Sequence, residues 1–146
     1  MNIFKLFTEW LKEYEPIGSW MYFNCTPVEE NTTSLNTAPS STTKEFIDGS
    51  KDVSINMSIN LIKSYDEEGT SDTNIDAINE VGELENWITE RDKNKDFPVL
   101  SDDGKIYITS IKVLSTLPSL AVDKTSHLAK YSFNIRLVYK DESEVI

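Results

Sequence analysis

The clearest pattern in the chain runs from Val53 to Leu61 and reads VSINMSINL. Apolar residues occupy every second position, and serine or asparagine fills each position between them. The side chains of a β-strand point alternately to its two faces, whereas a helix would spread this apolar set around its axis. The pattern therefore predicts a strand with one apolar face and one polar face.

Two other segments have the three- and four-residue spacing of amphipathic helices, which would cover the apolar face of such a strand. In the first, Asn2 is a candidate cap and Pro16 ends the helix near Tyr14. Its apolar stripe is Ile3, Phe7, Trp10, Leu11 and Tyr14.

The second predicted helix spans about Thr73 to Asp92, with Asp72 or Thr73 as its cap. Its expected buried face is Ile75, Ile78, Val81, Leu84 and Ile88, joined by Trp87. Gly82 inside it costs about 1 kcal/mol relative to alanine, which indicates either close packing or a local weakness.

The remaining elements read as strands joined by turns. Candidates are residues 20–25, 44–47, 105–115 and 130–140, the last with clear alternation, and the turn residues Asp48-Gly49-Ser50 precede the central strand. Helices do not alternate with these strands, so a mostly antiparallel sheet is expected. The fold class predicted for residues 1–146, taken as a single domain, is α+β: about four to six strands flanked by two amphipathic helices.

Residues 26–43 differ in composition, being rich in threonine, serine, asparagine and proline, with Val28 and Leu35 as the large apolar residues. Such a segment buries little apolar surface to offset the entropy lost on ordering. We expect an extended arm or loose hairpin in the isolated protein. The candidate assembly contacts in and just after this arm are Leu35, Pro39, Phe46, Asp48 and Gly49.

The charge of the chain limits its partners. A formal net charge of -11 argues against tight binding of nucleic acid, whose affinity comes largely from Lys and Arg, and against an acidic membrane surface. DNA that merely passes a surface is compatible with this charge. The acidic residues singled out for such a lumen or surface, with solvated loops as the alternative, are Glu29, Glu30, Asp66, Glu67 and Glu68. The N-terminal segment has too short an apolar run for a membrane span and lacks a signal-peptide pattern, so synthesis in the cytoplasm is expected.

No residue pattern points to catalysis, a metal or a cofactor. The single Cys25 cannot form an internal disulfide and is expected to be a small buried group, and the single His127 reads as a surface or strand-edge residue. Asp92, Asn94, Asp96 and Asp103 have the spacing of calcium-loop ligands, but Phe97 occupies the position where that loop needs glycine. The sequence has no Gly-rich phosphate loop, CxxC pair or HExxH helix.

The order of short motifs along the chain is informative. A helix with TEWLKEY, a strand with MYF, the segment EFIDGSK, the alternating strand, a helix with LENWITE, the connection FPVLSDDGK and the final strand KYSFNIRLVY follow one another. This series, over nearly the whole chain, resembles the small "minor capsid" proteins of tailed bacteriophages and prophages of Gram-positive bacteria, which belong with the tail terminator proteins. The longer Ser/Thr-rich stretch from Asn31 to Thr43 departs from the commoner pattern.

The resemblance implies a structural subunit in which helices flank a sheet. Such subunits form a closed ring, commonly a hexamer, at the head-proximal end of the tail tube, where the ring stops tube polymerisation and offers a surface for joining the head. The implied partners are other copies of the chain, the tail tube protein and a head-completion or connector protein, with DNA as passing cargo. The implied location is the head–tail junction of the virion, after synthesis in the host cytoplasm. The resemblance implies no catalytic residue and no cofactor.

Two other functions stay open at this point. A neighbouring head-to-tail connector subunit of the neck would sit on the head side and bind portal-proximal partners instead of the tube. An acidic module that binds or inhibits a host protein fits the net charge but not the order of motifs. An enzyme is the least favoured reading, because no base and nucleophile are brought together by the pattern.

Overall fold

The computed structural model describes residues 2–17, 21–25, 29–66, 72–114 and 119–146, apart from the side chains of residues 38–40 and 119. Within these residues the fold is α+β, as predicted, with a mixed and mostly antiparallel sheet and two α-helices. The elements in chain order are α1 (Ile3–Leu11), the 3-10 turn η1 (Glu15–Ile17), β1 (Tyr22–Phe23), β2 (Thr32–Glu45), β3 (Lys51–Ser64), α2 (Asp72–Lys93), β4 (Ile106–Val113), β5 (Ser119–Asp123) and β6 (Leu128–Asp141).

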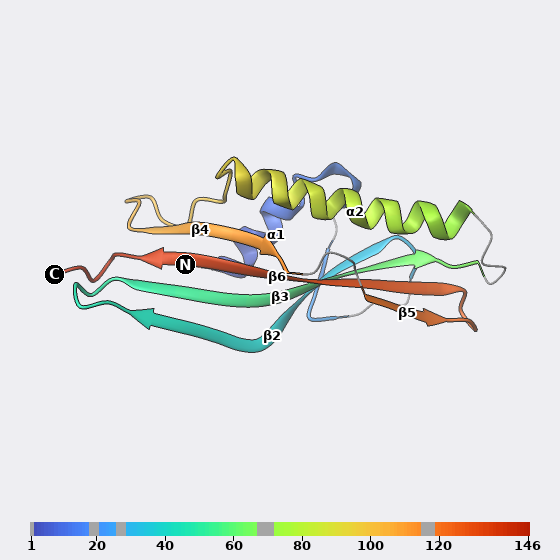
Figure 1. The fold of residues 1–146 in the computed structure, drawn as a ribbon, viewed down its shortest axis with the longest axis horizontal. Coiled ribbons are helices and arrows are strands. Elements are labelled where there is room, and N and C mark those ends of the chain that lie inside the picture. The colour runs from blue at the N-terminus through green and yellow to red at the C-terminus, as the bar shows by residue number, and fades with distance from the viewer. Residues whose placement is uncertain (1, 18–20, 26–28, 67–71, 115–118) are drawn as a thin grey trace.

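The described strands form one sheet in the order β1-β2-β3-β6-β4, and β5 pairs with the part of β6 that β4 does not reach. All neighbours are antiparallel except β1 and β2. The central pair β3–β6 runs from Lys51 opposite Asp141 to Ser64 opposite Leu128. Figure 1 shows the long strands aligned with the long axis of the molecule and α2 lying along the sheet.

The alternating segment from Val53 to Leu61 lies in the central strand β3. Met57, Ile59 and Leu61 are buried, and the register places them opposite Ile135, Phe133 and Tyr131 of β6, which are buried too. Together with side chains from both helices they form the core. The sequence pattern therefore identified the strand and its apolar face correctly.

Both helices pack on this apolar face. The Oδ1 atom of Asn2 accepts a hydrogen bond from the Lys5 backbone N–H at 3.2 Å, so Asn2 is the predicted cap of α1. The helix buries Ile3, Phe7, Trp10 and Leu11. It ends at Leu11 rather than near Tyr14, and Pro16 lies in the following turn η1.

The buried face of α2 differs from the prediction at its first turn. Val81, Leu84 and Ile88 are buried as expected, but Ala77 and not Ile75 completes the stripe, and Ile75 is 56% exposed. With 3.6 residues per turn, Ile75 lies about 140° around the helix from the centre of the buried stripe. Position on the helix, and not side-chain size, therefore decides which residue of the first turn is buried.

The expectation of an extended arm or loose hairpin at residues 26–43 is wrong for most of that segment, because residues 32–45 form the strand β2. β2 pairs with β3 from Thr32 opposite Ile62 to Glu45 opposite Lys51, with an irregularity between Thr37 and Ser41. Backbone hydrogen bonds to β3 satisfy the polar groups of the segment, and threonine fits a strand well. The 20–25 candidate contains only the two-residue β1 within the described residues, and β5 was not predicted.

Candidate functional site

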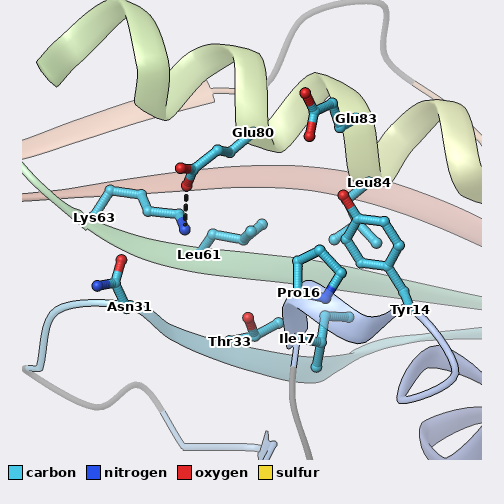
Figure 2. Close-up of a pocket in the computed structure, with 10 residues that line it drawn as sticks. All are labelled: Tyr14, Pro16, Ile17, Asn31, Thr33, Leu61, Lys63, Glu80, Glu83 and Leu84. Carbon is cyan, nitrogen blue, oxygen red and sulfur yellow. Dashed lines mark ion pairs between the residues drawn. The ribbon is translucent and has the colours of Figure 1, made fainter. Parts of the chain in front are cut away.

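A cavity of about 330 Å³ lies between the helix layer and the sheet. Figure 2 shows that α2 provides Glu80, Glu83 and Leu84, that β2 and β3 provide the opposite side, and that the segment after α1 closes one end. The residues on the other sides are Tyr14, Pro16, Ile17, Asn31, Thr33, Leu61 and Lys63. The cavity is therefore a gap where α2 and the strands diverge.

The charged groups of this cavity are mostly paired with one another. Lys63 Nζ lies 2.6 Å from Glu80 Oε2, with the lysine side chain 18% exposed. Partial burial raises the pKa of Tyr14, and the carboxylates of Glu83 and Glu80 raise it further. A phenol with a raised pKa stays protonated at neutral pH, so it is a hydrogen-bonding group here and not a base. The cavity has no nucleophile next to a general base among its lining residues.

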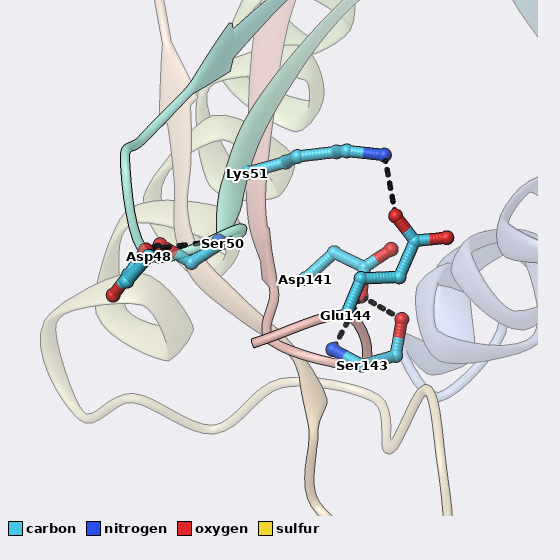
Figure 3. A network of polar contacts seen from close by, with 6 residues as sticks. All are labelled: Asp48, Ser50, Lys51, Asp141, Ser143 and Glu144. Atoms are coloured by element: carbon cyan, nitrogen blue, oxygen red, sulfur yellow. Dashed lines mark hydrogen bonds and ion pairs between the residues drawn. The ribbon is translucent and has the colours of Figure 1, made fainter. Parts of the chain in front are cut away.

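The far end of the sheet, at the β2–β3 turn, has a dense set of polar contacts, which Figure 3 shows. Asp48 Oδ1 accepts hydrogen bonds from the Ser50 hydroxyl at 2.6 Å and the Ser50 backbone N–H at 2.9 Å. Asp141 makes the same pair of bonds with Ser143 after β6. The pKa of each carboxyl is lowered because these hydrogen bonds favour its charged form.

The C-terminal residues 142–146 are fastened to this turn. Lys51 Nζ lies 3.2 Å from Glu144 Oε2, and the Ile146 N–H donates to the Asp48 carbonyl at 2.8 Å. Gly49 has a φ of +90°, and a Cβ placed on it would lie 2.3 Å from the carbonyl oxygen of Glu144. Glycine is therefore required at position 49 both by the positive φ of the turn and by the close approach of the Glu144 carbonyl, which lies after β6.

The structure corrects part of the candidate assembly contacts. Leu35 is fully buried opposite Ile59 in the core, so it is not the contact of an exposed arm. Phe46 lies in the β2–β3 turn with Lys44 Nζ and Lys140 Nζ at 5.3 and 5.1 Å from its ring centroid. Asp48 and Gly49 hold the turn and the C-terminus, and the side chain of Pro39 lies outside the described residues.

The acidic candidates gather at the opposite end of the sheet as far as they are described. Glu29 and Glu30 are exposed, and Glu30 Oε1 accepts a hydrogen bond from the Ser64 hydroxyl at 3.0 Å. Asp66 follows two residues after Ser64, and its backbone exchanges hydrogen bonds with the Asn74 side chain. Glu67 and Glu68 lie outside the described residues.

The residues weighed for catalysis lie apart in the fold. Cys25 follows β1 and is exposed, which corrects the expectation that it is buried. His127 lies in the turn between β5 and β6 with a φ of +55°, and its carbonyl accepts a hydrogen bond from the Tyr65 N–H. In the sheet order, β2 and β3 separate β1 from β6. This placement gives no nucleophile–base pair.

Asp92, the first residue of the calcium-like spacing, has a structural role. Its side chain is 5% exposed, and Oδ1 accepts a hydrogen bond from the Ile111 backbone N–H at 2.9 Å. Its Oδ2 atom pairs with Lys112 Nζ. β4 is an edge strand, and the Ile111 N–H would be unpaired without Asp92. Asp92 therefore caps this backbone N–H. Among the described residues no group of three or more His, Cys, Asp or Glu side chains is placed to hold a metal ion.

The polar face of the sheet carries a charge pattern that the sequence reading missed. We call one part of this surface the open face. It consists of the residues of β2, β3, β6 and β4 that lie on the side of the sheet away from the helices. Only the half of the sheet near the β2–β3 turn is included. Serine, threonine and asparagine make up most of it. Its charged residues are Lys44, Lys112, Arg136 and Lys140, with Asp52 as the acid. The two-residue period of the four strands, combined with their register, would have revealed this pattern.

Comparison with protein-family models finds no match to the chain, and comparison with curated proteins finds none either. In the part of the chain that the structure describes, no helix combines the length and apolar character required to cross a membrane.

Proposed function

We propose that the chain is a structural subunit of a phage tail, the tail terminator. In this proposal copies of the chain form a ring, six in the commonest arrangement, on the head-proximal end of the tail tube. The ring stops addition of further tube subunits and offers the surface to which a head-completion or connector protein binds. DNA passes the ring without being bound, and the chain has no enzymatic role.

The observation that carries this proposal is the order of motifs along nearly the whole chain, from TEWLKEY through EFIDGSK and LENWITE to KYSFNIRLVY. The fold is of the kind that this resemblance implies, with helices packed on one face of an antiparallel sheet. Because a fold class alone does not define a function, the order of motifs carries the proposal and the fold class is only compatible with it.

Features of the surface are compatible with assembly. A ring requires two different patches on each subunit that meet head to tail and close by rotation. Exposed residues 41–45 of β2 lie beyond the two residues paired with β1, so along the described chain this stretch of edge has no strand on its outer side. The helices pack on one face of the sheet and the open face is the other, so the open face and the exposed surface of α2 supply polar patches on opposite sides of the subunit.

The test uses a tail tube protein, the partner that this proposal assigns to the chain. Purified tube protein is allowed to polymerise with and without the full chain, and tube lengths and ends are measured by electron microscopy. The proposal predicts shorter tubes with extra density at one end at substoichiometric amounts of the chain. Unchanged tube lengths with bare ends would contradict it, and density on portal-side complexes alone would favour the neck connector.

A further inference from the structure

The charges of this molecule are segregated by face. The chain has 14 basic and 25 acidic residues, yet the strand residues of the open face include four basic residues and one acid. Two of these cations are ion-paired, Lys140 with Asp52 at 3.9 Å and Lys112 with Asp92 at the end of α2, so the charge offered to a partner is carried mainly by Lys44 and Arg136. Arg136 and Lys44 are exposed there, and Lys140 is half-buried beside the ring of Phe46. An acidic protein that gathers cations on one face has a surface that attracts negative partners.

The exposed side of α2 has the opposite charge. Asp72, Asp76, Glu83 and Glu90 are exposed and lie on the side of the helix away from the buried stripe, and Glu83 also borders the cavity described above. Glu83 and Glu90 are two helical turns apart, which is about 10.5 Å along the axis. On the open face, Arg136 and Lys140 lie four residues apart on β6, which is roughly 13 Å along a strand.

The geometry points to head-to-tail association in which the open face of one copy docks on the acidic side of α2 of a second copy. This inference rests on the proposed function and names the interface that would build its ring. The helices and the open face lie on opposite sides of the sheet, so the two patches do not compete on one subunit. Contacts between two different patches repeat from copy to copy, as a ring or filament requires.

A second copy explains these surfaces better than nucleic acid does. The net charge of -11 repels phosphates over the whole molecule, whereas α2 supplies an acidic partner that every copy of the chain carries. The open face spans four strands about 4.8 Å apart and only part of their length, so a single contact buries less than a standard interface. Association between two copies should therefore be weak and sensitive to salt, and ring closure should strengthen it.

The experiment uses two charge-reversed forms of the full chain. The sheet variant carries Lys44→Glu and Arg136→Glu, and the helix variant carries Glu83→Lys and Glu90→Lys. Self-association is measured by sedimentation and light scattering over a range of salt. Each variant alone should associate about tenfold or more weakly than the wild type, because like charges then face each other. An equimolar mixture should recover association, because each reversed patch now meets an opposite charge on the other variant.

The control removes the same number of cations elsewhere, by Lys105→Glu and Lys124→Glu in exposed turns, and should associate as the wild type does. Circular dichroism and unfolding curves confirm that each variant is folded. A wild type that stays monomeric to about 1 mM at low salt overturns the inference. So does a mixture that fails to recover association, or binding of duplex DNA by the open face without self-association.

Failure of this inference is separable from failure of the proposed function. If both variants still cap tail tubes as the wild type does, the interface is wrong and the terminator role stands. If the mixture recovers self-association but the wild type leaves tube growth unchanged, the interface stands and the terminator role is wrong.

Discussion

At the scale of single residues, the structure requires glycine at position 49 but not at position 82. A Cβ on Gly82 would meet nothing within 4 Å, so no packing requires glycine inside α2. Replacing Gly82 by alanine should therefore stabilise the fold by about 0.5–1 kcal/mol, because alanine loses less backbone entropy in a helix. Chemical denaturation measures this, and destabilisation by the substitution would contradict the packing described for α2.

The substitution Gly49→Ala is the matched opposite case. It should destabilise the fold by roughly 1–3 kcal/mol, because alanine is strained at a φ of +90° and its Cβ meets the Glu144 carbonyl. The loss should be smaller in a chain that ends at Asp141, since that chain lacks the clash but keeps the strain. Equal losses in both chains would show that the C-terminus does not lie on this turn.

The carboxyls of Asp48 and Asp141 make stability at this end depend on pH. Their folded-state pKa values are lowered, so the stability that they contribute is present above the ordinary Asp pKa near 4 and is lost as the pH falls through the lower folded values. Asn at position 48 keeps an acceptor for Ser50 but does not titrate. Asp48→Asn should therefore flatten the fall of the thermal midpoint between neutral and strongly acidic pH, and an unchanged slope would contradict this role.

The sequence predicted individual residues well where one local rule decided the outcome. Asn2 caps α1, and the alternation in β3 placed Met57 and Ile59 in the core. The prediction failed where pairing with distant segments decides the outcome: Cys25 is exposed, and it follows β1, which lies at the edge of the sheet.

At the scale of elements, the end of α2 protects the outer edge of β4. Asp92→Ala should destabilise the fold by about 1–3 kcal/mol, because it leaves the Ile111 N–H without its acceptor. Lys112→Met keeps the cap on Ile111 but leaves the Asp92 carboxylate without its cation. Because the lysine side chain is 61% exposed, water can replace Nζ, so the loss should be smaller than for Asp92→Ala. Urea unfolding compares the two, and equal losses would show that the ion pair, not the backbone cap, is the stabilising contact.

The strand β2 is the element that composition alone misjudged. Its Ser, Thr and Asn content is typical of a loop, but β3 supplies hydrogen-bond partners along its length, and Leu35 is buried where the core needs it. Leu35→Ala should destabilise by about 2–5 kcal/mol, while Thr43→Ala on the exposed edge of the same strand should have an effect within about 0.5 kcal/mol. Similar small effects at both positions in thermal unfolding would restore the loose-arm interpretation.

At the scale of the whole molecule, the sequence predicted the fold class because β3 and β6 each carry a two-residue period and both helices carry apolar stripes. It did not predict the charge pattern of the open face, because Lys44, Asp52, Lys140 and the rest of that face come together only through the register of four strands. The candidate surfaces therefore depend on pairing, whereas the core depends on local periodicity.

We propose above that the chain is a ring-forming structural subunit at one end of a tail tube. Cryo-electron microscopy of tubes assembled with the full chain tests it most directly. We expect a closed ring of this chain at one end only, with the open face of each copy against α2 of its neighbour. Tubes without a terminal ring, or single copies of the chain scattered along the tube wall, would contradict it.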